Sequence, residues 1–232
     1  MNARTTTLVA IAIAAGLMGG LTAADVGAPA EINKKFEHPD VPEFVQKFEG
    51  ESREIFTQRD AIVAACKLEP GMDVADVGAG TGLFTRLMAA KVAPKGKVYA
   101  ADISREFVDH ILATCKAGGI SNAEGVVCTQ TSSGLKKKSV DFVFICDTYH
   151  HFEHPAATMK SIVKAMRPGA RLVLVDFKRG DDASDFVKGH VRADKDVFRK
   201  EIEEAGLEFV SESPILKENY FLTFQKAAPK TN

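Results

Sequence analysis

Residues 74–85 read VADVGAGTGLFT and decide the fold. The short apolar run that ends at Val77 is typical of a buried strand, and glycines follow it at positions 78, 80 and 82. Glycine adopts positive φ without strain and lets the backbone approach a ligand closely. From Leu83 the residues are suited to a helix, whose first amides have no partner within the helix. The segment therefore predicts a strand, a ligand-binding loop and a helix.

The acids around this loop indicate which ligand it suits. A dinucleotide loop with the spacing G-x-G-x-x-G would need glycine at position 83, which is Leu83, and Asp76 at the strand end would repel a pyrophosphate. A carboxylate there suits an ammonium group instead. Asp102 ends the next predicted strand, where it can accept hydrogen bonds from both hydroxyls of a ribose. The ligand so described has a ribose, an ammonium and no phosphate, as S-adenosylmethionine does; the alternative is a tight turn with Asp102 as a helix cap.

Predicted strands and helices alternate along the chain. Strands are expected at 73–77, 97–101, 126–128, 140–146, 171–176, 207–211 and 220–225, and helices at 42–56, 60–66, 83–92, 105–117, 155–166 and 196–205. This alternation predicts an α/β fold with a mainly parallel sheet and helices on both faces, and the apolar strand 140–146 suits its centre. A proline-containing loop joins the last two strands, which predicts an antiparallel last strand.

The composition places the chain among ordinary globular proteins. It has 232 residues, 45% hydrophobic and 26% charged, with 30 Lys and Arg against 31 Asp and Glu. Collagen-like, disordered and disulfide-knot classes are excluded, and the balance of charge argues against a protein that binds nucleic acid by neutralising phosphates. The four cysteines have no metal-binding spacing and are expected to be small buried apolar residues.

The N-terminus has the pattern of a secretory signal. Arg4 precedes the apolar run 8–21, and Thr22-Ala23-Ala24 provides a small-residue cleavage site. We expect a signal peptide at 1–24 and export, with the periplasm as the expected location; an uncleaved anchor and a misassigned start codon are the alternatives, the latter leaving a cytoplasmic protein. No stable membrane span is expected after cleavage. The other expected parts are an N-terminal arm and cap helix at 25–59, a single domain at 60–226 and a tail at 227–232.

The sequence resembles the class I S-adenosylmethionine-dependent methyltransferases. The matching segments are VADVGAGTGLFT, ADIS at 101–104 and VDFVFICDTYHHF at 140–152. The resemblance implies a Rossmann-like seven-stranded sheet, with the last strand inserted antiparallel. It also implies a set of cofactor-binding residues: Asp76, Gly78, Ala79, Gly80 and Gly82 at the methionine part, Asp102 at the ribose, Ile103 against the adenine, Gln130 where relatives often have an acid, and Asp147.

Candidate acceptor-side residues follow the fourth predicted strand, where ligands bind in open α/β sheets. We expect Tyr149, His150 and His151 there, and a neutral histidine can take a proton at working pH. One of the two histidines is the candidate base, and the alternative is that they pack and help to start the next helix. His190, Arg192 and, from the cap, Arg53 and Arg59 are further candidates for ligand contacts.

A metal site is not expected from these residues. His150, His151, Glu153 and His154 lie close in sequence, but no recognised ligand spacing is met, and adjacent histidines on a turn are expected to diverge.

Two functions remain open from sequence. The favoured one is transfer of a methyl group from S-adenosylmethionine to a small-molecule acceptor by direct displacement. The alternative is a non-catalytic or degenerate S-adenosylmethionine-binding protein, since the supply of this cofactor outside the cytoplasm is not obvious. An oxidoreductase is disfavoured by Asp76 and Leu83. The acceptor and the oligomeric state are left open.

Overall fold

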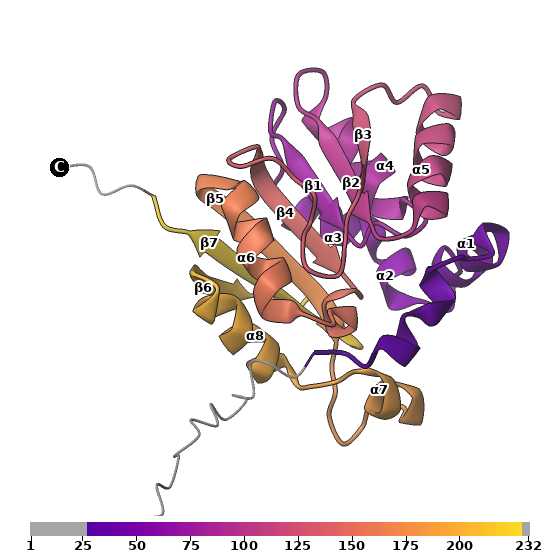
Figure 1. Ribbon diagram of the computed structural model, residues 1–232, viewed down its shortest axis with the longest axis vertical. Helices are drawn as coiled ribbons and strands as arrows, with labels where there is room; N and C mark the ends of the chain where they lie inside the picture. Colours follow the sequence, from indigo (N-terminus) through magenta and orange to yellow (C-terminus); the bar gives the residue numbers. More distant parts are fainter. Residues whose placement is uncertain (1–26, 229–232) are drawn as a thin grey trace, which may run out of the picture.

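A computed structural model describes residues 27–228, in which one seven-stranded sheet forms the centre of the molecule (Figure 1). The expected signal peptide and residues 229–232 of the expected tail lie outside the described residues. The strand order is β3-β2-β1-β4-β5-β7-β6. The strands are β1 (Val74–Val77), β2 (Val98–Asp102), β3 (Ala123–Val127), β4 (Val140–Cys146), β5 (Met166–Phe177), β6 (Leu207–Glu212) and β7 (Asn219–Lys226).

Only β7 runs against the other strands. It pairs antiparallel with β5 on one side and with β6 on the other, whereas β1 to β5 pair in parallel. The predicted α/β class, the mainly parallel sheet and the antiparallel last strand are therefore confirmed. The order of the strands reverses between β1 and β4, and their carboxyl ends are where open sheets of this kind bind ligands.

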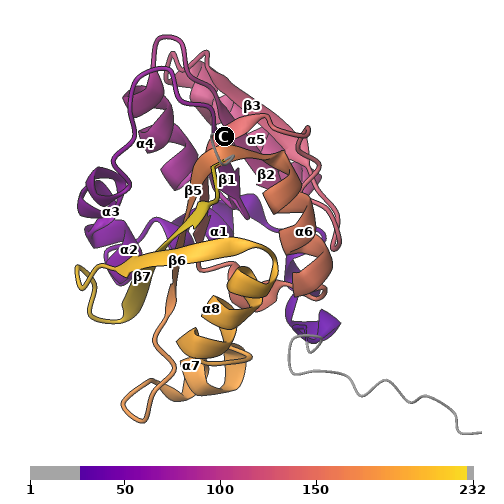
Figure 2. The same ribbon diagram turned by 90° about the vertical axis from the view of Figure 1, so that its left-hand side faces the viewer.

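Helices cover both faces of the sheet. The helices are α1 (Val41–Phe48), α2 (Glu54–Thr57), α3 (Arg59–Ala65), α4 (Leu83–Val92), α5 (Arg105–Ala117), α6 (Pro155–Ala165), α7 (Asp185–His190) and α8 (Lys195–Glu204), with 3-10 turns η2 (Ala30–Ile32), η3 (Lys34–Phe36) and η4 (Tyr149–His151). Figure 2 shows α3 and α4 on one side of the sheet and α6 on the other.

The central strand β4 contributes to the packing on both faces. Val143 and Ile145 pack with Ile162 of α6, while Phe142 and Phe144 pack with the helices on the opposite face. Alternate residues of a strand point to opposite faces, so a continuous apolar run is buried on both. This explains why 140–146 was recognisable as the centre of the sheet.

The N-terminal region differs from its prediction. The expected helix 42–56 is two helices, α1 and α2, with a break that contains Gly50, a residue of low helix propensity. The expected extended arm instead forms the 3-10 turns η2 and η3. The short helix α7 was not predicted, because its six residues are too few to show a clear apolar period.

Two sets of hydrogen bonds join distant parts of the chain beside the strand ends. The carboxylate of Glu54 in α2 accepts hydrogen bonds from the backbone amides of Lys217, Glu218 and Asn219, at 2.6, 2.8 and 3.1 Å. In the N-terminal region, Ala28 donates its amide to the carbonyl of Phe152 at 2.8 Å. The N-terminal helices and the loop before β7 are thus held at the same end of the sheet.

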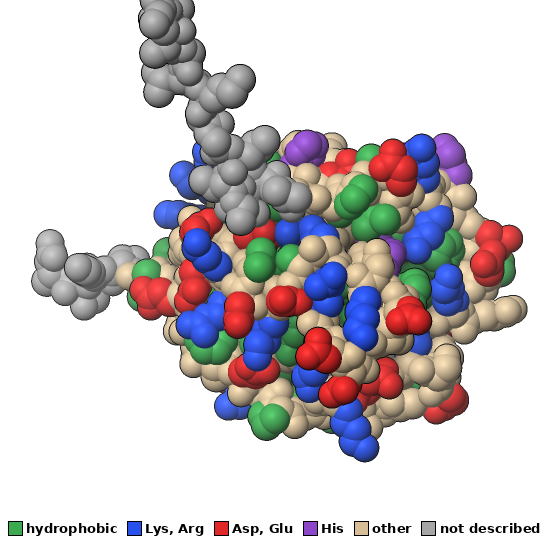
Figure 3. All heavy atoms as spheres, turned by 90° about the horizontal axis from the view of Figure 1, so that it is seen from below, with side chains coloured by type: hydrophobic (Ala, Val, Ile, Leu, Met, Phe, Trp, Pro, Cys, Tyr) green, Lys and Arg blue, Asp and Glu red, His purple; other side chains and the backbone are tan. Residues whose placement is uncertain are grey.

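The surface carries charges of both signs. On the face in Figure 3, lysine and arginine side chains are interspersed with aspartate and glutamate. Among residues 27–228, no helix has the length and apolar character that a membrane crossing requires. All four cysteines are free thiols; Cys66 and Cys115 are buried as expected, whereas Cys128 and Cys146 are only partly covered.

Candidate active site

A cavity of about 450 Å³ lies at the carboxyl ends of β1, β2 and β4. In Figure 1, α1, α2 and α7 gather around this end of the sheet. The cavity is lined by side chains from both the strand ends and these helices. Of the residues expected to bind cofactor, those that line it are Asp76, Gly78, Ala79, Gly80, Asp102, Ile103, Gln130 and Asp147.

Asp76 is a buried acid at the end of β1. One of its carboxylate oxygens accepts a hydrogen bond from the Thr85 hydroxyl at 2.6 Å. Burial raises the pKa of Asp76 to about 7, and the nearby Asp102 adds to this rise. A buried acid that is costly to ionise gains from a positively charged partner. The position is therefore suited to a ligand ammonium.

The glycine loop is held by the segment that follows β4. Gly78 has φ +73°, and a Cβ there would lie 2.1 Å from Thr148 Cγ2, so only glycine fits. Gly82 also has positive φ, but it does not line the cavity. A Cβ at Gly82 would lie 2.7 Å from a side-chain carbon of Ile111 in α5. The structure thus gives Gly82 a packing role between α4 and α5, and its contact with the cofactor stays a prediction.

Asp102 ends β2 with its side chain in a fixed orientation. Its two oxygens accept hydrogen bonds from the backbone amides of Gly80, at 2.9 Å, and Ser104, at 3.0 Å. Burial raises the pKa of Asp102, and these amides lower it again. Each carboxylate oxygen has a second lone pair, so both can still accept from a pair of ligand hydroxyls. The neighbouring Ile103 gives the cavity an apolar wall.

Asp147 is bound on two sides by protein groups. It accepts hydrogen bonds from the Arg53 guanidinium and, at 2.6 Å, from the Asn219 side-chain amide. Its backbone has φ +46°, an uncommon conformation for a residue with a side chain. Burial raises the pKa of Asp147 to about 6, against the lowering effect of Arg53. Asp147 therefore positions Arg53 at the cavity wall, whereas Arg59 bonds to the Phe56 carbonyl and is not among the lining residues.

Gln130 is held by a polar group from the next loop. Its amide donates to Glu153 Oε1 at 2.8 Å, and the same oxygen accepts from Asn33 Nδ2 at 2.8 Å. Gln130 lines the cavity, as predicted, while Glu153 lies behind it.

His150 is buried and paired with an acid on β5. Its Nδ1 lies 2.7 Å from Asp176 Oδ1, and its backbone amide donates to Asp176 Oδ2 at 3.3 Å. A carboxylate only accepts, so Nδ1 carries the hydrogen and Nε2 of His150 has a free lone pair. This arrangement fixes both the tautomer and the orientation of the imidazole.

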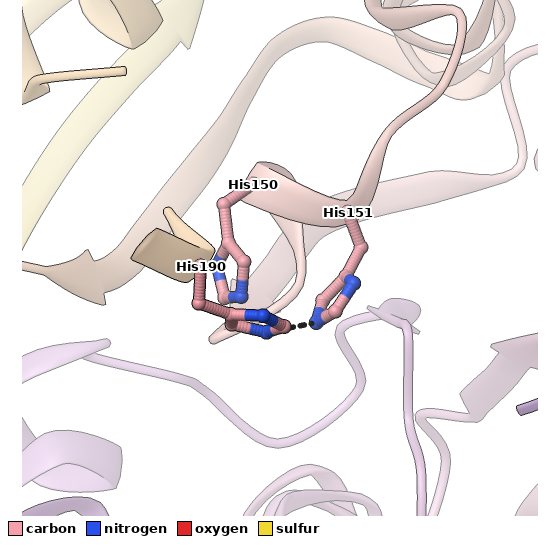
Figure 4. A group of neighbouring side chains, drawn as sticks. All are labelled: His150, His151 and His190. Atoms are coloured by element: carbon pink, nitrogen blue, oxygen red, sulfur yellow. Dashed lines mark hydrogen bonds between the residues drawn. The ribbon is translucent and has the colours of Figure 1, made fainter. Parts of the chain in front are cut away.

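His151 and His190 lie beside His150 (Figure 4). The ring centroids of His150 and His151 are 4.3 Å apart, and His190 Nε2 is 3.3 Å from His151 Nε2. The expectation that adjacent histidines diverge is therefore wrong: the two rings pack together, and each is held by its own hydrogen-bond partner, Asp176 for His150 and Asn33 for His151. Burial and the neighbouring histidines lower the pKa of His151 to about 2, and the pKa of His190 is lowered to about 4.

Tyr149 and Arg192 lie away from the cavity lining. Tyr149 is fully buried and packs against Phe152 and Phe198, with ring centroids 4.9 and 5.0 Å away. Arg192 pairs with Glu201 at 2.6 Å and stacks over Phe198. The structure therefore places the tyrosine in the core in place of the expected acceptor contact.

Much of the cavity wall that faces the strand ends was not predicted from the sequence. Its lining side chains come from the N-terminal segment and α1: Asn33, Lys35, Phe36, Phe44, Lys47 and Phe48. They lie in the stretch predicted as an arm and a cap, and only the pattern of phenylalanines in α1 pointed to a buried face. Asp176 was also missed, although an acid at the end of an apolar strand is the same signal that identified Asp76.

Comparisons with known proteins agree with this geometry. Residues 75–174 match the family described as a methyltransferase domain. A ubiquinone/menaquinone biosynthesis C-methyltransferase of Ectopseudomonas mendocina is 28% identical over 116 residues, which cover 48% of this chain and 44% of that protein. A protein-L-isoaspartate O-methyltransferase of Aeropyrum pernix is 31% identical over 109 residues, covering 46% and 39% respectively. The matches thus span less than half the length of these relatives.

The fold comparison extends over more of the chain. A crystal structure of a SAM-dependent methyltransferase from Aquifex aeolicus superposes with a TM-score of 0.72 and 23% identity, covering 81% of this chain and 99% of that one. The fold is a Rossmann-like methyltransferase fold, which is defined by the order of the strands together with the glycine loop and the acids at the strand ends. The matched methyltransferase domain and the shared fold support a class I S-adenosylmethionine-dependent methyltransferase, as the resemblance predicted.

Proposed function

We propose that this protein binds S-adenosylmethionine in the cavity at the strand ends and transfers its methyl group to a small-molecule acceptor. The observation that carries the proposal is the pair of buried acids, Asp76 and Asp102, at neighbouring strand ends beside one glycine loop. A ligand that combines an ammonium with a ribose satisfies both carboxylates at once.

The residues present fit this cofactor. Side chains at Gly78 are excluded by Thr148, so the loop keeps its backbone open toward the cavity. Asp76 would hold the ammonium, Asp102 the ribose hydroxyls, and Ile103 the adenine face. Gln130 offers an amide where an acid is common among relatives, and its orientation is already set by Glu153. The departure from the family pattern thus leaves a polar side chain at that position.

When bound, S-adenosylmethionine supplies an activated methyl group and its leaving group. The protein supplies alignment, exclusion of water and, where the acceptor must lose a proton, a base. His150 is the stronger base candidate, since Asp176 accepts from Nδ1 at 2.7 Å and would stabilise the imidazolium formed at Nε2. His151 has a neutral amide, that of Asn33, at the equivalent place.

The acceptor end of the cavity has an apolar and basic wall. Phe36 packs edge-on against His151, with ring centroids 5.1 Å apart, and the exposed Lys35 and Lys47 also line the cavity. We propose an acceptor with an apolar body and a negative charge, which such a wall would bind by contact area and by charge.

Isothermal titration calorimetry with S-adenosylmethionine and with NAD tests the cofactor. Incubation with methyl-labelled cofactor and a panel of phenols, carboxylates, thiols and amines then tests transfer. Binding without transfer to any acceptor class favours the second candidate, a non-catalytic S-adenosylmethionine-binding protein. Binding of NAD alone contradicts the proposal.

Export is part of the proposal and rests on the N-terminal sequence. The apolar run at 8–21 and the small residues before position 25 are the features that support it. N-terminal sequencing of the mature protein tests it: a first residue at Asp25 is expected, and a mature chain that starts at Met1 contradicts it.

A further inference from the structure

Three histidines from two separate segments meet at one end of the cavity. His150 and His151 belong to η4, and His190 ends α7, 39 residues further along the chain. One ring nitrogen from each residue lies within 4.8 Å of those of the other two. Figure 4 shows the three rings grouped together, with His190 facing His151. All three side chains line the cavity.

The hydrogen bonds around the cluster leave lone pairs for a cation. Asn33 Nδ2 donates to the His151 carbonyl at 3.0 Å and to Glu153 Oε1 at 2.8 Å, which fixes the orientation of the amide. Its oxygen therefore accepts from Nδ1 of His151 at 2.8 Å, and Nε2 of His151 carries no hydrogen. His150 has the same arrangement through Asp176. Such outer hydrogen bonds are the means by which proteins orient histidine ligands of metals.

The spacing is close to that of a coordinated ion. Zinc–nitrogen bonds of about 2.0–2.1 Å place two nitrogens of a tetrahedral site about 3.3–3.4 Å apart. Nε2 of His151 and Nε2 of His190 are 3.3 Å apart, where His190 donates a hydrogen bond to His151 in the metal-free protein. A cation at this point takes the place of that hydrogen, and the His190 hydrogen moves to Nδ1. The other two nitrogen–nitrogen distances are at most 4.8 Å. They would have to shorten by at most about 1.5 Å to reach the tetrahedral spacing, and small rotations of the imidazole rings can supply that change.

Buried negative charge lies next to the cluster. Asp176 is fully buried against His150, and Asp147 lies close enough for Asp176 to raise its pKa. The opposing positive charges are Arg53, which is paired with Asp147, and the exposed Lys35 and Lys47. Buried acid behind the ligands compensates the charge that a divalent cation would bring into the cavity.

We propose that His150, His151 and His190 bind one divalent transition-metal ion, of the class that prefers imidazole nitrogen, such as Zn²⁺. Three protein ligands would leave one coordination position of a tetrahedral ion open for a ligand in the cavity that all three side chains line. The site was not recognisable from sequence, because His190 approaches only through the fold.

One consequence rests on the proposed function. An acceptor oxygen or sulfur bound at the open position would lose its proton to solvent water more readily, because a bound cation lowers the pKa of its ligands. In the metal-bound protein, His150 is then a ligand, and Asp176 acts by orienting it. Nε2 of His150 can act as a base only in the metal-free protein.

Metal binding is tested on the untagged full chain without cofactor or acceptor. After dialysis against chelator, the protein is titrated with Zn²⁺ by calorimetry and with Co²⁺ by visible absorption. We expect about one equivalent of each ion, with the intense d–d bands of a four-coordinate Co²⁺ site. The absence of stoichiometric binding by the folded protein overturns the proposal.

Variants assign the site to the cluster. His190→Ala and His151→Ala are each expected to weaken Zn²⁺ binding by at least about tenfold, as is Asn33→Ala, since lost second-sphere partners commonly cost about 10–100-fold. His154→Gln is the matched control, because His154 is exposed on the same loop and outside the cluster. Equal binding by His190→Ala and His154→Gln overturns the proposal. Calorimetry with S-adenosylmethionine on the metal-free protein tests the cofactor separately, so the two proposals fail independently.

Discussion

Asn33 binds the loop after β4 through three hydrogen bonds, with its oxygen 2.8 Å from His151 Nδ1. The same side chain donates to the His151 carbonyl and to Glu153. A residue from the N-terminal segment thereby holds a histidine 118 positions away, next to the cavity. The segment that looked like an arm in the sequence is a wall of the site.

Removing the Asn33 amide should loosen this wall. Asn33→Ala leaves the buried partners of the amide unpaired, and we expect a loss of about 1–3 kcal/mol in the free energy of unfolding. Urea unfolding monitored by circular dichroism measures it. Gln46→Ala on the exposed surface of α1 serves as a control, and an equally small effect in both variants would show that Asn33 does not hold the segment.

The ribose role of Asp102 predicts a binding defect. Asp102→Ala should weaken S-adenosylmethionine binding by about 1–3 kcal/mol, because a charge-assisted hydrogen bond is lost. Calorimetry measures the dissociation constant. Asp109→Ala on the exposed face of α5 is the matched control, since Asp109 makes only a surface pair with Arg105 at 3.7 Å. Unchanged affinity in Asp102→Ala contradicts the role.

The raised pKa of Asp76 predicts how cofactor stabilisation depends on pH. Because burial raises this pKa to about 7, above the ordinary value of 3.8, the ionised acid destabilises the free protein, and stability is lost as pH rises through 7. Asp147, with a pKa of about 6, contributes in the same direction at lower pH. A ligand ammonium stabilises the ionised Asp76.

The increase in melting temperature on adding S-adenosylmethionine should therefore be larger at pH 8 than at pH 6. Thermal melts with and without cofactor measure it at both values. Asp76→Asn removes the titrating group and should remove most of the difference. A larger shift at pH 6 in the native protein would show that Asp76 is not the partner of the ammonium.

The pairing of His150 with Asp176 predicts that changing either residue lowers turnover but leaves cofactor binding nearly unchanged. His150→Gln and Asp176→Asn should lower kcat of the metal-free enzyme by about 10²–10⁴, the usual contribution of a general base, with little change in cofactor affinity. Single-turnover transfer and calorimetry measure the two quantities. Loss of cofactor binding to the same degree would indicate packing in place of catalysis.

Gly78 predicts a steric cost in the glycine loop. Gly78→Ala places a methyl group 2.1 Å from Thr148 Cγ2 at a positive φ and should destabilise the fold by about 1–3 kcal/mol, with weaker cofactor binding. The double variant with Thr148→Ala should recover part of the loss. Gly180→Ala, with open space around its Cβ, should be nearly neutral.

The strand-end half of the site was predictable because its signals are local. Asp76, the glycines and Asp102 each follow directly from a strand, and the parallel order of the sheet brings strand ends together. The apolar run of β4 likewise identified its own position. Tyr149 was placed wrongly because a 3-10 turn sends its side chain into the core while its two neighbours face the cavity.

The other half depends on contacts that no short motif encodes. His190 reaches His151 through α7, a helix too short to show an apolar period. Asn33 and Lys35 lie in a polar stretch whose structure is set by what it packs against. The break between α1 and α2 was missed because Gly50 weakens a helix without excluding one. The positions of these residues depend on packing between segments far apart in the chain, and a single sequence does not reveal such packing.

The three hydrogen bonds from consecutive amides to Glu54 affect when the site can form during synthesis of the chain. Lys217 leaves the ribosome 163 residues after Glu54, so this wall of the site stays incomplete until that much later segment has emerged. A nascent chain that lacks β7 would expose an unfinished active site, and ligand binding should arise only as the last strand pairs with β5.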